Sequence, residues 1–175
     1  MDEQELIKAI KQIKNLKKQD LVIHFRFATS GLIDEGNTHP FPLSNKRKQL
    51  RQLKITTNIG IAHNGVITFT SQNKNDLSDT QIFIKDYLYL LSQETDIFTP
   101  VMQKLIQSAT NSKWAIMTPD NVYLLGEFIN DKGIYYSNTG YKTINKRYYK
   151  NYYSAEHWQY PAKNKSIETK TISSK

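Results

Sequence analysis

The sequence predicts an α+β fold, in which helices and antiparallel β-hairpins occupy separate stretches of the chain. Apolar residues recur at helical spacing over residues 3–18, 78–91 and 100–109. Short β-prone runs bounded by turn residues fill most of the remainder up to residue 137. Because strands and helices do not alternate one by one, this order favours α+β layers over a parallel, doubly wound sheet.

The first two predicted elements are an amphipathic helix over residues 3–18 and a strand over residues 21–27. The helix has a lysine-rich outer face. The strand has the sequence Leu-Val-Ile-His-Phe-Arg-Phe and places His24 and Arg26 on one face. A guanidinium on a buried strand is costly to desolvate unless it is paired or binds an anion. The strand therefore predicts either a structural ion pair or a ligand site.

The next stretch predicts an ordered loop and a tight hairpin. Residues 34–42 are dense in turn formers, which favours an ordered loop or an edge segment. Residues 59–62 and 66–70 are β-prone and are joined through His63-Asn64-Gly65. Because Asn and Gly both tolerate positive φ angles, this junction predicts a two-residue hairpin turn.

Two helices are predicted in the middle of the chain. Ser78 and Gln81 form a capping-box pattern ahead of an apolar-periodic run, which predicts a helix start at this point. Pro100 suits the first turn of a second helix, because proline lacks the N–H that would be unpaired there.

The last predicted elements are a hairpin and one further strand. Residues 113–118 and 122–128 are β-rich runs on either side of a Pro-Asp-Asn turn. Residues 133–137 form another short strand. We therefore expect a folded domain over residues 1–140, followed by a basic, tyrosine-rich extension over residues 141–175 whose end is disordered.

The composition excludes several kinds of chemistry. The 175 residues contain no cysteine, so this sequence offers no disulfide, no thiolate metal ligand and no cysteine nucleophile. The first residues are acidic and then amphipathic, unlike a secretory signal, and no apolar run approaches the ~20 residues of a membrane span. We expect a soluble, cytoplasmic protein without a cofactor.

The net charge of +8 comes mainly from the extension. From Tyr141 onward, eight Lys and Arg residues stand against two Glu residues, which accounts for +6 of the +8 and leaves the domain near neutral. Tyrosines interleave with these cations, a pattern that suits base stacking and phosphate contact in a nucleic-acid-binding protein. The favoured alternative is a solvated lysine-rich tail whose tyrosines pack back on the domain.

Metal, serine-nucleophile and phosphate-loop chemistry are not favoured. His24, His39 and His63 are candidate metal ligands, but no pair has the i, i+4 spacing of a zinc helix site and no acidic fourth ligand is evident. Ser30 does not lie in a Gly-x-Ser-x-Gly elbow. The seven glycines are scattered instead of gathered in a phosphate loop.

Two short motifs have both a structural and a functional interpretation. On the structural interpretation His63-Asn64-Gly65 is a tight turn; on the functional one, the Asn64 amide and the Gly65 N–H aim at one spot, as an oxyanion hole requires. Ser78-Asp79-Thr80 is a favourable helix N-terminus, since an acidic side chain in the first turn interacts well with the helix dipole. The alternative is that it tethers the ammonium group of a ligand.

Taken together, four motifs occur in a characteristic order. They are His24-x-Arg26-x-Ala28-Thr29-x-Gly31, Asn37-Thr38-His39-Pro40-Phe41, His63-Asn64-Gly65 and Ser78-Asp79-Thr80. This order resembles the glutaminase domain of class II glutamine amidotransferases, which are N-terminal nucleophile hydrolases. The resemblance extends over about residues 21–137 and is nearest to the small stand-alone proteins of bacteria and their phages.

The resemblance implies a fold and a reaction. The fold is a four-layer αββα sandwich, here N-terminally truncated, with the active site between the edges of the two sheets. The family reaction hydrolyses the side-chain amide of glutamine to glutamate and ammonia. No metal and no cofactor are implied.

The resemblance also implies a role for each motif. Arg26 binds the α-carboxylate of glutamine, a task that suits a bidentate guanidinium. Thr29 and His63 belong to the same substrate pocket. Asn64-Gly65 forms the oxyanion hole, and the carboxylate of Asp79 receives the α-ammonium group.

Two departures separate this sequence from the family. Ser30 stands where many relatives carry a histidine. The family nucleophile is an N-terminal cysteine whose own α-amino group acts as the general base, and this sequence contains no cysteine. A helix predicted from Glu3 corresponds to the one that follows the first hairpins of the family, so roughly forty residues are expected to be missing at the front. We therefore expect no glutaminase activity from this chain alone.

Three explanations are compatible with these departures. The chain is a truncated or split reading frame, a degenerate relative that still binds glutamine or a similar small amino acid, or a repurposed protein-binding module. A missing strand pair exposes sheet edges, which predicts a homodimer or a partner chain that supplies the missing strands. Nucleic acid is a less favoured partner, and a membrane is not predicted to be one.

Overall fold

The computed structural model describes residues 3–13, 19–25, 34–70, 76–140 and 142. The chain divides into two units, residues 1–138 and residues 139–175. In the second unit only Thr139, Gly140 and Lys142 are described, so the extension predicted over residues 141–175 lies almost wholly outside the described residues. The first unit contains helices and antiparallel strands, and the predicted α+β class is confirmed.

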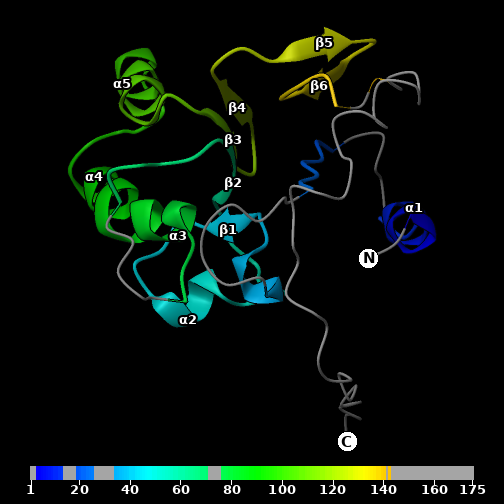
Figure 1. Ribbon diagram of the computed structural model, residues 1–175, viewed down its shortest axis with the longest axis horizontal. Helices are drawn as coiled ribbons and strands as arrows, with labels where there is room; N and C mark the ends of the chain where they lie inside the picture. The colour runs from blue at the N-terminus through cyan, green and yellow to red at the C-terminus, as the bar shows by residue number, and fades with distance from the viewer. Residues whose placement is uncertain (1–2, 14–18, 26–33, 71–75, 141, 143–175) are drawn as a thin grey trace, which may run out of the picture. The chain divides into compact units, whose positions relative to one another are not determined.

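A four-stranded antiparallel sheet forms the centre of the first unit (Figure 1). Its strands follow the order of the chain: β1 (Phe41–Pro42), β2 (Gly60–Asn64), β3 (Lys113–Met117) and β4 (Val122–Leu125). The predicted hairpin between β3 and β4 is confirmed, with the Thr118 N–H donating to the Asn121 carbonyl at 2.8 Å across the turn. The predicted strand at 133–137 is also present, as β6 (Ile134–Tyr136), and it pairs with β5 (Ile129–Asp131) in a separate two-stranded sheet.

The helices start where the capping residues predict. Ser78 accepts from the Gln81 N–H, and its own N–H donates to the Gln81 side chain, which completes the capping box. Thr99 caps the helix that opens at Pro100. The helical elements are α1 (Glu3–Lys11), η2 (Glu35–Asn37), α2 (Arg47–Leu50), α3 (Asp79–Phe83), the π-helical η3 (Ile84–Leu88), α4 (Tyr89–Glu94) and α5 (Pro100–Thr110).

The predicted hairpin between residues 59–62 and 66–70 is wrong. Residues 66–70 form no strand. Strand β2 has two hydrogen-bonding edges, and these are already occupied: Ile61 pairs with Phe41 of β1, and Ala62 pairs with Ala115 of β3. The Asn-Gly signal therefore marks the end of a central strand, after which the chain turns away toward α3.

Two N-terminal predictions are also corrected in their described parts. Helix α1 ends at Lys11, earlier than expected, while residues 14–18 lie outside the described residues. Residues 20–25 form no strand, because no other described strand pairs with them, and the remaining two residues of the predicted 21–27 strand lie outside the described ranges.

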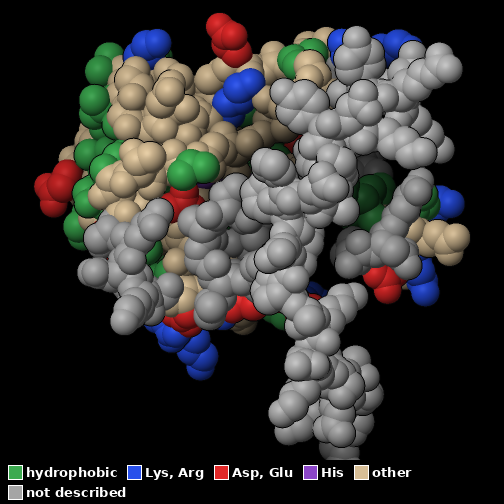
Figure 2. All heavy atoms as spheres, viewed as in Figure 1, with side chains coloured by type: hydrophobic (Ala, Val, Ile, Leu, Met, Phe, Trp, Pro, Cys, Tyr) green, Lys and Arg blue, Asp and Glu red, His purple; other side chains and the backbone are tan. Residues whose placement is uncertain are grey.

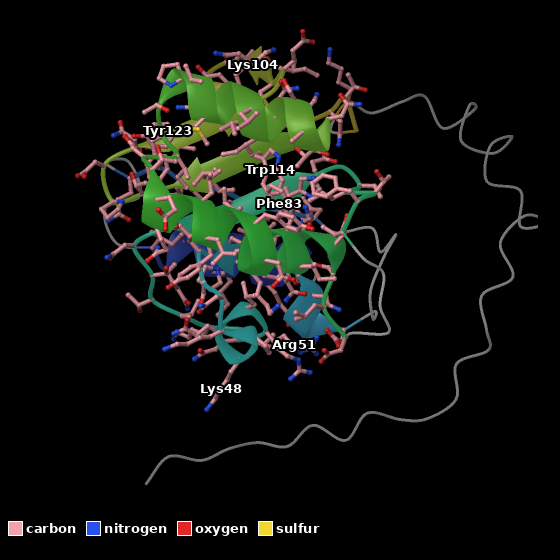
Figure 3. All side chains as sticks on the ribbon, turned by 90° about the vertical axis from the view of Figure 1, so that its left-hand side faces the viewer. Lys48, Arg51, Phe83, Lys104, Trp114 and Tyr123 are labelled. Atoms are coloured by element: carbon pink, nitrogen blue, oxygen red, sulfur yellow. The ribbon has the colours of Figure 1, made fainter. Side chains whose placement is uncertain are left out.

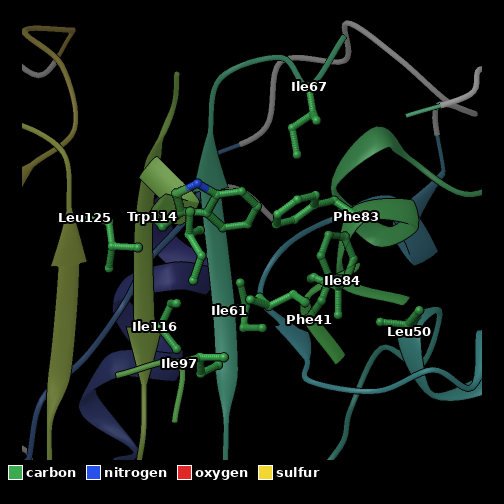
Figure 4. Close-up of a cluster of buried hydrophobic side chains, with 12 residues drawn as sticks. Phe41, Leu50, Ile61, Ile67, Phe83, Ile84, Ile97, Trp114, Ile116 and Leu125 are labelled. Atoms are coloured by element: carbon green, nitrogen blue, oxygen red, sulfur yellow. The ribbon is translucent and has the colours of Figure 1, made fainter. Parts of the chain in front are cut away.

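The two faces of the four-stranded sheet have different surroundings. Alternate residues of the strands pack against the helices, where Trp114 and Phe83 lie with ring centroids 5.3 Å apart between sheet and helix (Figures 3 and 4). The buried cluster on this face consists of Phe41, Leu50, Ile61, Ile67, Phe83, Ile84, Leu88, Ile97, Ile106, Trp114, Ile116 and Leu125. The other face borders a cavity.

The predicted ordered loop at residues 34–42 is confirmed as η2 followed by the edge strand β1. The Arg51 guanidinium donates to the carboxylate of Asp34 and to the Asp76 carbonyl, each at 2.7 Å. The fully buried Gln81 amide donates at 2.8 Å to the carbonyls of Gly36 and Leu50. Buried backbone acceptors need such partners, so this one side chain joins η2, α2 and α3.

In the described part of the chain, no helix is both long enough and apolar enough to cross a membrane.

Replacing Trp114 by Ala should destabilise the first unit by about 3–5 kcal/mol. The side chain is fully buried, and its indole N–H donates to the Thr110 hydroxyl at 2.9 Å, so the change leaves both a cavity and an unpaired acceptor. Urea unfolding measures the loss. Val101→Ala is the control: with that side chain 76% exposed, it should change the free energy of unfolding by less than about 0.5 kcal/mol. Equal effects of the two variants would contradict the assigned core.

Candidate functional site

The candidate site lies where strand β2 ends, and its first component is the imidazole of His63. This side chain points to the core face, where its ring packs against the ring of Trp114 with centroids 4.3 Å apart and planes tilted by 35°. It is only 3% exposed, and its Nδ1 lies 2.9 Å from the Thr80 hydroxyl. Burial lowers the pKa of His63 to about 4, against the opposing effect of the Asp79 charge and with a smaller contribution from His24 in the same direction. The imidazole is therefore neutral at pH 7.

Asp79 is the second component, at the first residue of α3. Its carboxylate Oδ2 accepts from the Ile67 N–H at 2.8 Å, and the Thr80 hydroxyl lies 3.5 Å from Oδ1. With the proton of His63 on Nδ1, the three groups form one chain, in which His63 donates to Thr80 and Thr80 donates to Asp79. The end of β2, the turn after it and the start of α3 are thus tied together by hydrogen bonds.

The atoms around Gly65 leave no room for a side chain at this position. A Cβ at this position would lie 2.2 Å from Ser112 Oγ, 2.7 Å from Ser112 Cβ and 3.2 Å from His63 Nε2. Its φ of +155° is also one that L-residues rarely adopt. Only glycine therefore fits after Asn64 without movement of the neighbouring chain.

The side chain of Asn64 lies on the face of the sheet opposite His63, since neighbouring strand residues point to opposite faces. Its Nδ2 donates to the Ser137 hydroxyl at 2.6 Å, just after β6. The Lys113 ammonium donates to the Ser137 carbonyl at 2.7 Å. An amide and an ammonium group therefore lie at one end of the open sheet face, where both donate to Ser137.

A cavity of about 740 Å³ lies over this open face. Residues of β2, β3 and β4 line it, together with residues of the 19–24 segment and the β5–β6 hairpin. The lining residues of the three sheet strands are Ala62, His63, Asn64, Lys113, Ala115, Val122 and Leu124. The volume is that of a typical small-molecule site.

Three histidines from separate segments come together beside the site. The His24 Nε2 lies 3.1 Å from the His63 carbonyl oxygen. The rings of His24 and His39 are 4.1 Å apart between centroids, and those of His39 and His63 are 6.3 Å apart. Among the described residues, no group of three or more His, Asp and Glu side chains is arranged to hold a metal ion. The three rings pack together beside the end of β2, and His24 also lines the cavity.

The structure brings together four of the six residues that the sequence singles out. His63 and Asp79 are linked through Thr80, and Asn64 and Gly65 follow His63 at the end of β2, with the Asn64 side chain on the opposite face of the sheet. The other two, Arg26 and Thr29, lie outside the described residues.

The sequence analysis assigned no role of their own to three residues of the site. Thr80 links His63 to Asp79, Ser112 packs against Gly65, and Ser137 accepts from Asn64. The position of Thr80 directly after Asp79 is the one local signal that was available. Ser112 and Ser137 come from distant parts of the sequence, and no spacing rule connects them to the Asn-Gly pair.

Comparisons of the chain with protein-family models, with curated proteins and with solved structures gave no significant match. The site is therefore interpreted from its own geometry and from the motif resemblance.

Gly65→Ala and Gly60→Ala should have different outcomes, although Gly60 begins β2 and Gly65 directly follows it. Gly65→Ala should cost more than about 1 kcal/mol of unfolding free energy, because the new methyl group meets Ser112 and the positive φ is strained. A methyl group added at Gly60 would enter open space, so Gly60→Ala should be neutral or slightly stabilising. Chemical denaturation of both variants measures this. Similar values for the two would show that the contact with Ser112 is absent.

Acidification should destabilise the fold through His63. Its pKa in the folded state, about 4, is lower than the ordinary 6.5, so the unfolded chain binds the proton more readily. This contribution is fully present above pH 6.5, is lost as the pH falls toward 4, and amounts to about 3 kcal/mol in all. The difference in unfolding free energy between the parent and His63→Gln, followed from pH 7.5 to pH 4.5, isolates it. A difference independent of pH would mean that His63 titrates normally in the fold.

Proposed function

We propose that this chain is a class II glutamine amidotransferase-like domain that binds glutamine, or a similar small amino acid, at the end of β2. The observation that carries this proposal is the hydrogen bond between the Asp79 carboxylate and the Ile67 N–H, just beyond Gly65. By the motif resemblance, Asn64-Gly65 is an oxyanion hole and Asp79 receives an ammonium group. This bond holds the start of α3 against the turn that follows Asn64-Gly65, so two motifs that are separate in the sequence lie next to each other.

The proposed roles follow from the chemistry of each group. The Asn64 amide and the Gly65 N–H are donors, and they would stabilise negative charge that develops on the side-chain carbonyl oxygen of glutamine. Asp79 supplies the countercharge for the α-ammonium group, and Arg26 that for the α-carboxylate. The ring of His63 is on the core side of β2, so we assign it to positioning Asn64-Gly65 through its contact with the turn.

The family reaction also needs a thiolate, which attacks the amide carbon and expels ammonia, after which water hydrolyses the thioester. None of the 175 residues is a cysteine. We therefore propose that this chain alone binds glutamine without hydrolysing it, and that catalysis requires a nucleophile from outside this sequence.

The proposal extends to the architecture and the setting of the protein. The helix-covered sheet β1–β4 would be one half of a four-layer αββα sandwich, and the open face over the cavity would receive the second sheet. Such a protein would work in the cytoplasm, where glutamine is available as substrate.

Calorimetric titration with L-glutamine and with glutaramate tests the proposal. Glutaramate keeps the carboxylate and the side-chain amide but lacks the α-ammonium group. A charge-assisted hydrogen bond to Asp79 is worth roughly 1.5–3 kcal/mol, so the parent should bind L-glutamine about 10- to 100-fold more tightly than glutaramate. Asp79→Asn should remove this preference while the amide oxygen still accepts from the Ile67 N–H.

The control for this titration is Asp86→Asn, on η3, whose carboxylate is 46% exposed and pairs with Lys85. It should bind both ligands as the parent does. Arg26→Ala should weaken the binding of both ligands alike, since both carry the carboxylate. Failure of the parent to bind L-glutamine, or equal affinity for the two ligands, would contradict the proposed site. Release of glutamate by the purified chain would contradict the proposed need for an outside nucleophile.

A further inference from the structure

The side chain of Asn64 belongs to a hydrogen-bonded group whose other two members have no part in the proposed function. Its Nδ2 donates at 2.6 Å to the hydroxyl of Ser137, which lies 73 positions further along the sequence. The ammonium group of Lys113 donates to the carbonyl oxygen of the same serine at 2.7 Å. Ser137 is therefore held at two of its atoms, one contacted from β2 and the other from β3.

Asn64 and Lys113 reach Ser137 from the same face of the sheet. The two residues are directly opposite each other in the register of β2 and β3. Side chains at opposite positions of an antiparallel pair lie on one face. This is the open face, because Asn64, Lys113 and Ser137 all line the cavity of about 740 Å³. A ligand in the cavity that reaches the end of β2 would therefore meet an amide that is already hydrogen-bonded to a neighbour.

The side chain of Lys113 passes a glycine on its way to Ser137. Gly126 directly follows β4, and its φ of +90° is one that L-residues rarely adopt. A Cβ at this position would lie 3.2 Å from Lys113 Cγ and 3.4 Å from the carbonyl oxygen of Ser112. The first of these contacts is tighter than ordinary van der Waals packing. Glycine at position 126 therefore leaves room for the aliphatic part of Lys113.

An asparagine side chain needs such support if it is to be a fixed donor. The torsion that turns the amide group is broad, so without a partner the Asn64 amide would sample many orientations. A donor stabilises developing negative charge best when it is oriented before the reaction. Nδ2 carries two hydrogens, so the bond to Ser137 uses one of them, and the second can be donated to an oxygen atom of a ligand.

We propose that Ser137 and Lys113 are positioning residues for the ligand-binding amide of Asn64. Lys113 holds the backbone of Ser137, and the Ser137 hydroxyl sets the orientation of the amide. The inference rests on the role of Asn64 in the proposed function, but the orientation of the amide can be measured without a ligand. Removal of the serine hydroxyl should change the Asn64 side chain and leave the fold intact.

Nuclear magnetic resonance of the Asn64 side-chain amide tests the positioning in the free, full chain. Asn64→Asp removes one pair of side-chain signals and so assigns it. In Ser137→Ala this pair should shift, and its hydrogens should exchange with water roughly three- to tenfold faster, as expected for the loss of one neutral hydrogen bond. Ser137→Thr keeps a hydroxyl and should restore the parent values. Lys113→Met keeps the apolar stem and should give a smaller change in the same direction.

A serine–amide pair on α4 provides the matched control. There the Gln93 Nε2 donates to the Ser92 hydroxyl at 3.2 Å. Figure 2 shows hydrophobic side chains gathered over α4 and α5, and Leu90 of α4 is more than half exposed. Ser92→Ala should leave the Asn64 signals unchanged. Asn64 signals that stay the same in Ser137→Ala, or that change equally in Ser92→Ala, would overturn the proposal.

Binding measurements separate positioning of the amide from a general effect on the fold. L-Norvaline has the α-ammonium group and the α-carboxylate of glutamine but lacks the side-chain amide. Ser137→Ala should weaken the binding of L-glutamine roughly three- to tenfold and leave that of L-norvaline unchanged, because only glutamine can accept from Asn64. Equal losses for both ligands would overturn the positioning role. A parent chain that does not bind L-glutamine would contradict the proposed function, and the Asn64 signals in Ser137→Ala would still decide whether the serine orients the amide.

Discussion

The hydrogen-bonded chain from His63 through Thr80 to Asp79 holds the end of the central strand against the first turn of a helix. Burial removes His63 from water, and the neutral imidazole is retained there because Thr80 satisfies its Nδ1. The Asp79 carboxylate in turn accepts a hydrogen bond from the Ile67 N–H. The turn that contains Asn64-Gly65 is therefore held on both sides, by β2 before it and by Asp79 after it. Such preorganisation is what fixed hydrogen-bond donors require if they are to stabilise charge in a reaction.

The two faces of the sheet differ in what they border, and β2 contributes to both of them. His63 and Asn64 are neighbours in the sequence, yet one contributes to the core and the other to the cavity, since successive strand residues alternate between faces. On one face, the strands pack against the helices and form the buried apolar cluster. The other face has the small side chains Ala62 and Ala115 in register at its centre, and both line the cavity.

The sequence predicted best those features that local chemistry decides. The capping box at Ser78, the proline at the start of α5 and the turn between β3 and β4 all depend on residues within a few positions, and all three are present. The Asn-Gly signal was misleading because tertiary pairing with β1 and β3 occupied both edges of β2. Ser112 and Ser137 were missed for a related reason, since only the fold brings them to residues 64–65. The strand expected at 21–27 belongs to neither described sheet over residues 21–25, and residues 26–27 lie outside the described ranges.

The two hydrogen bonds that the Gln81 amide donates have a consequence for how the molecule opens. Gly36 and Leu50 are far from Gln81 in the sequence, yet both of their carbonyls depend on its one side chain. Neither η2 nor α2 can detach without leaving a buried amide or carbonyl unpaired, at a cost of about 1–3 kcal/mol for each group. The loop that contains His39 and the helix that begins with Asp79 therefore belong to one cooperative unit, and their amide protons should exchange with solvent together instead of segment by segment.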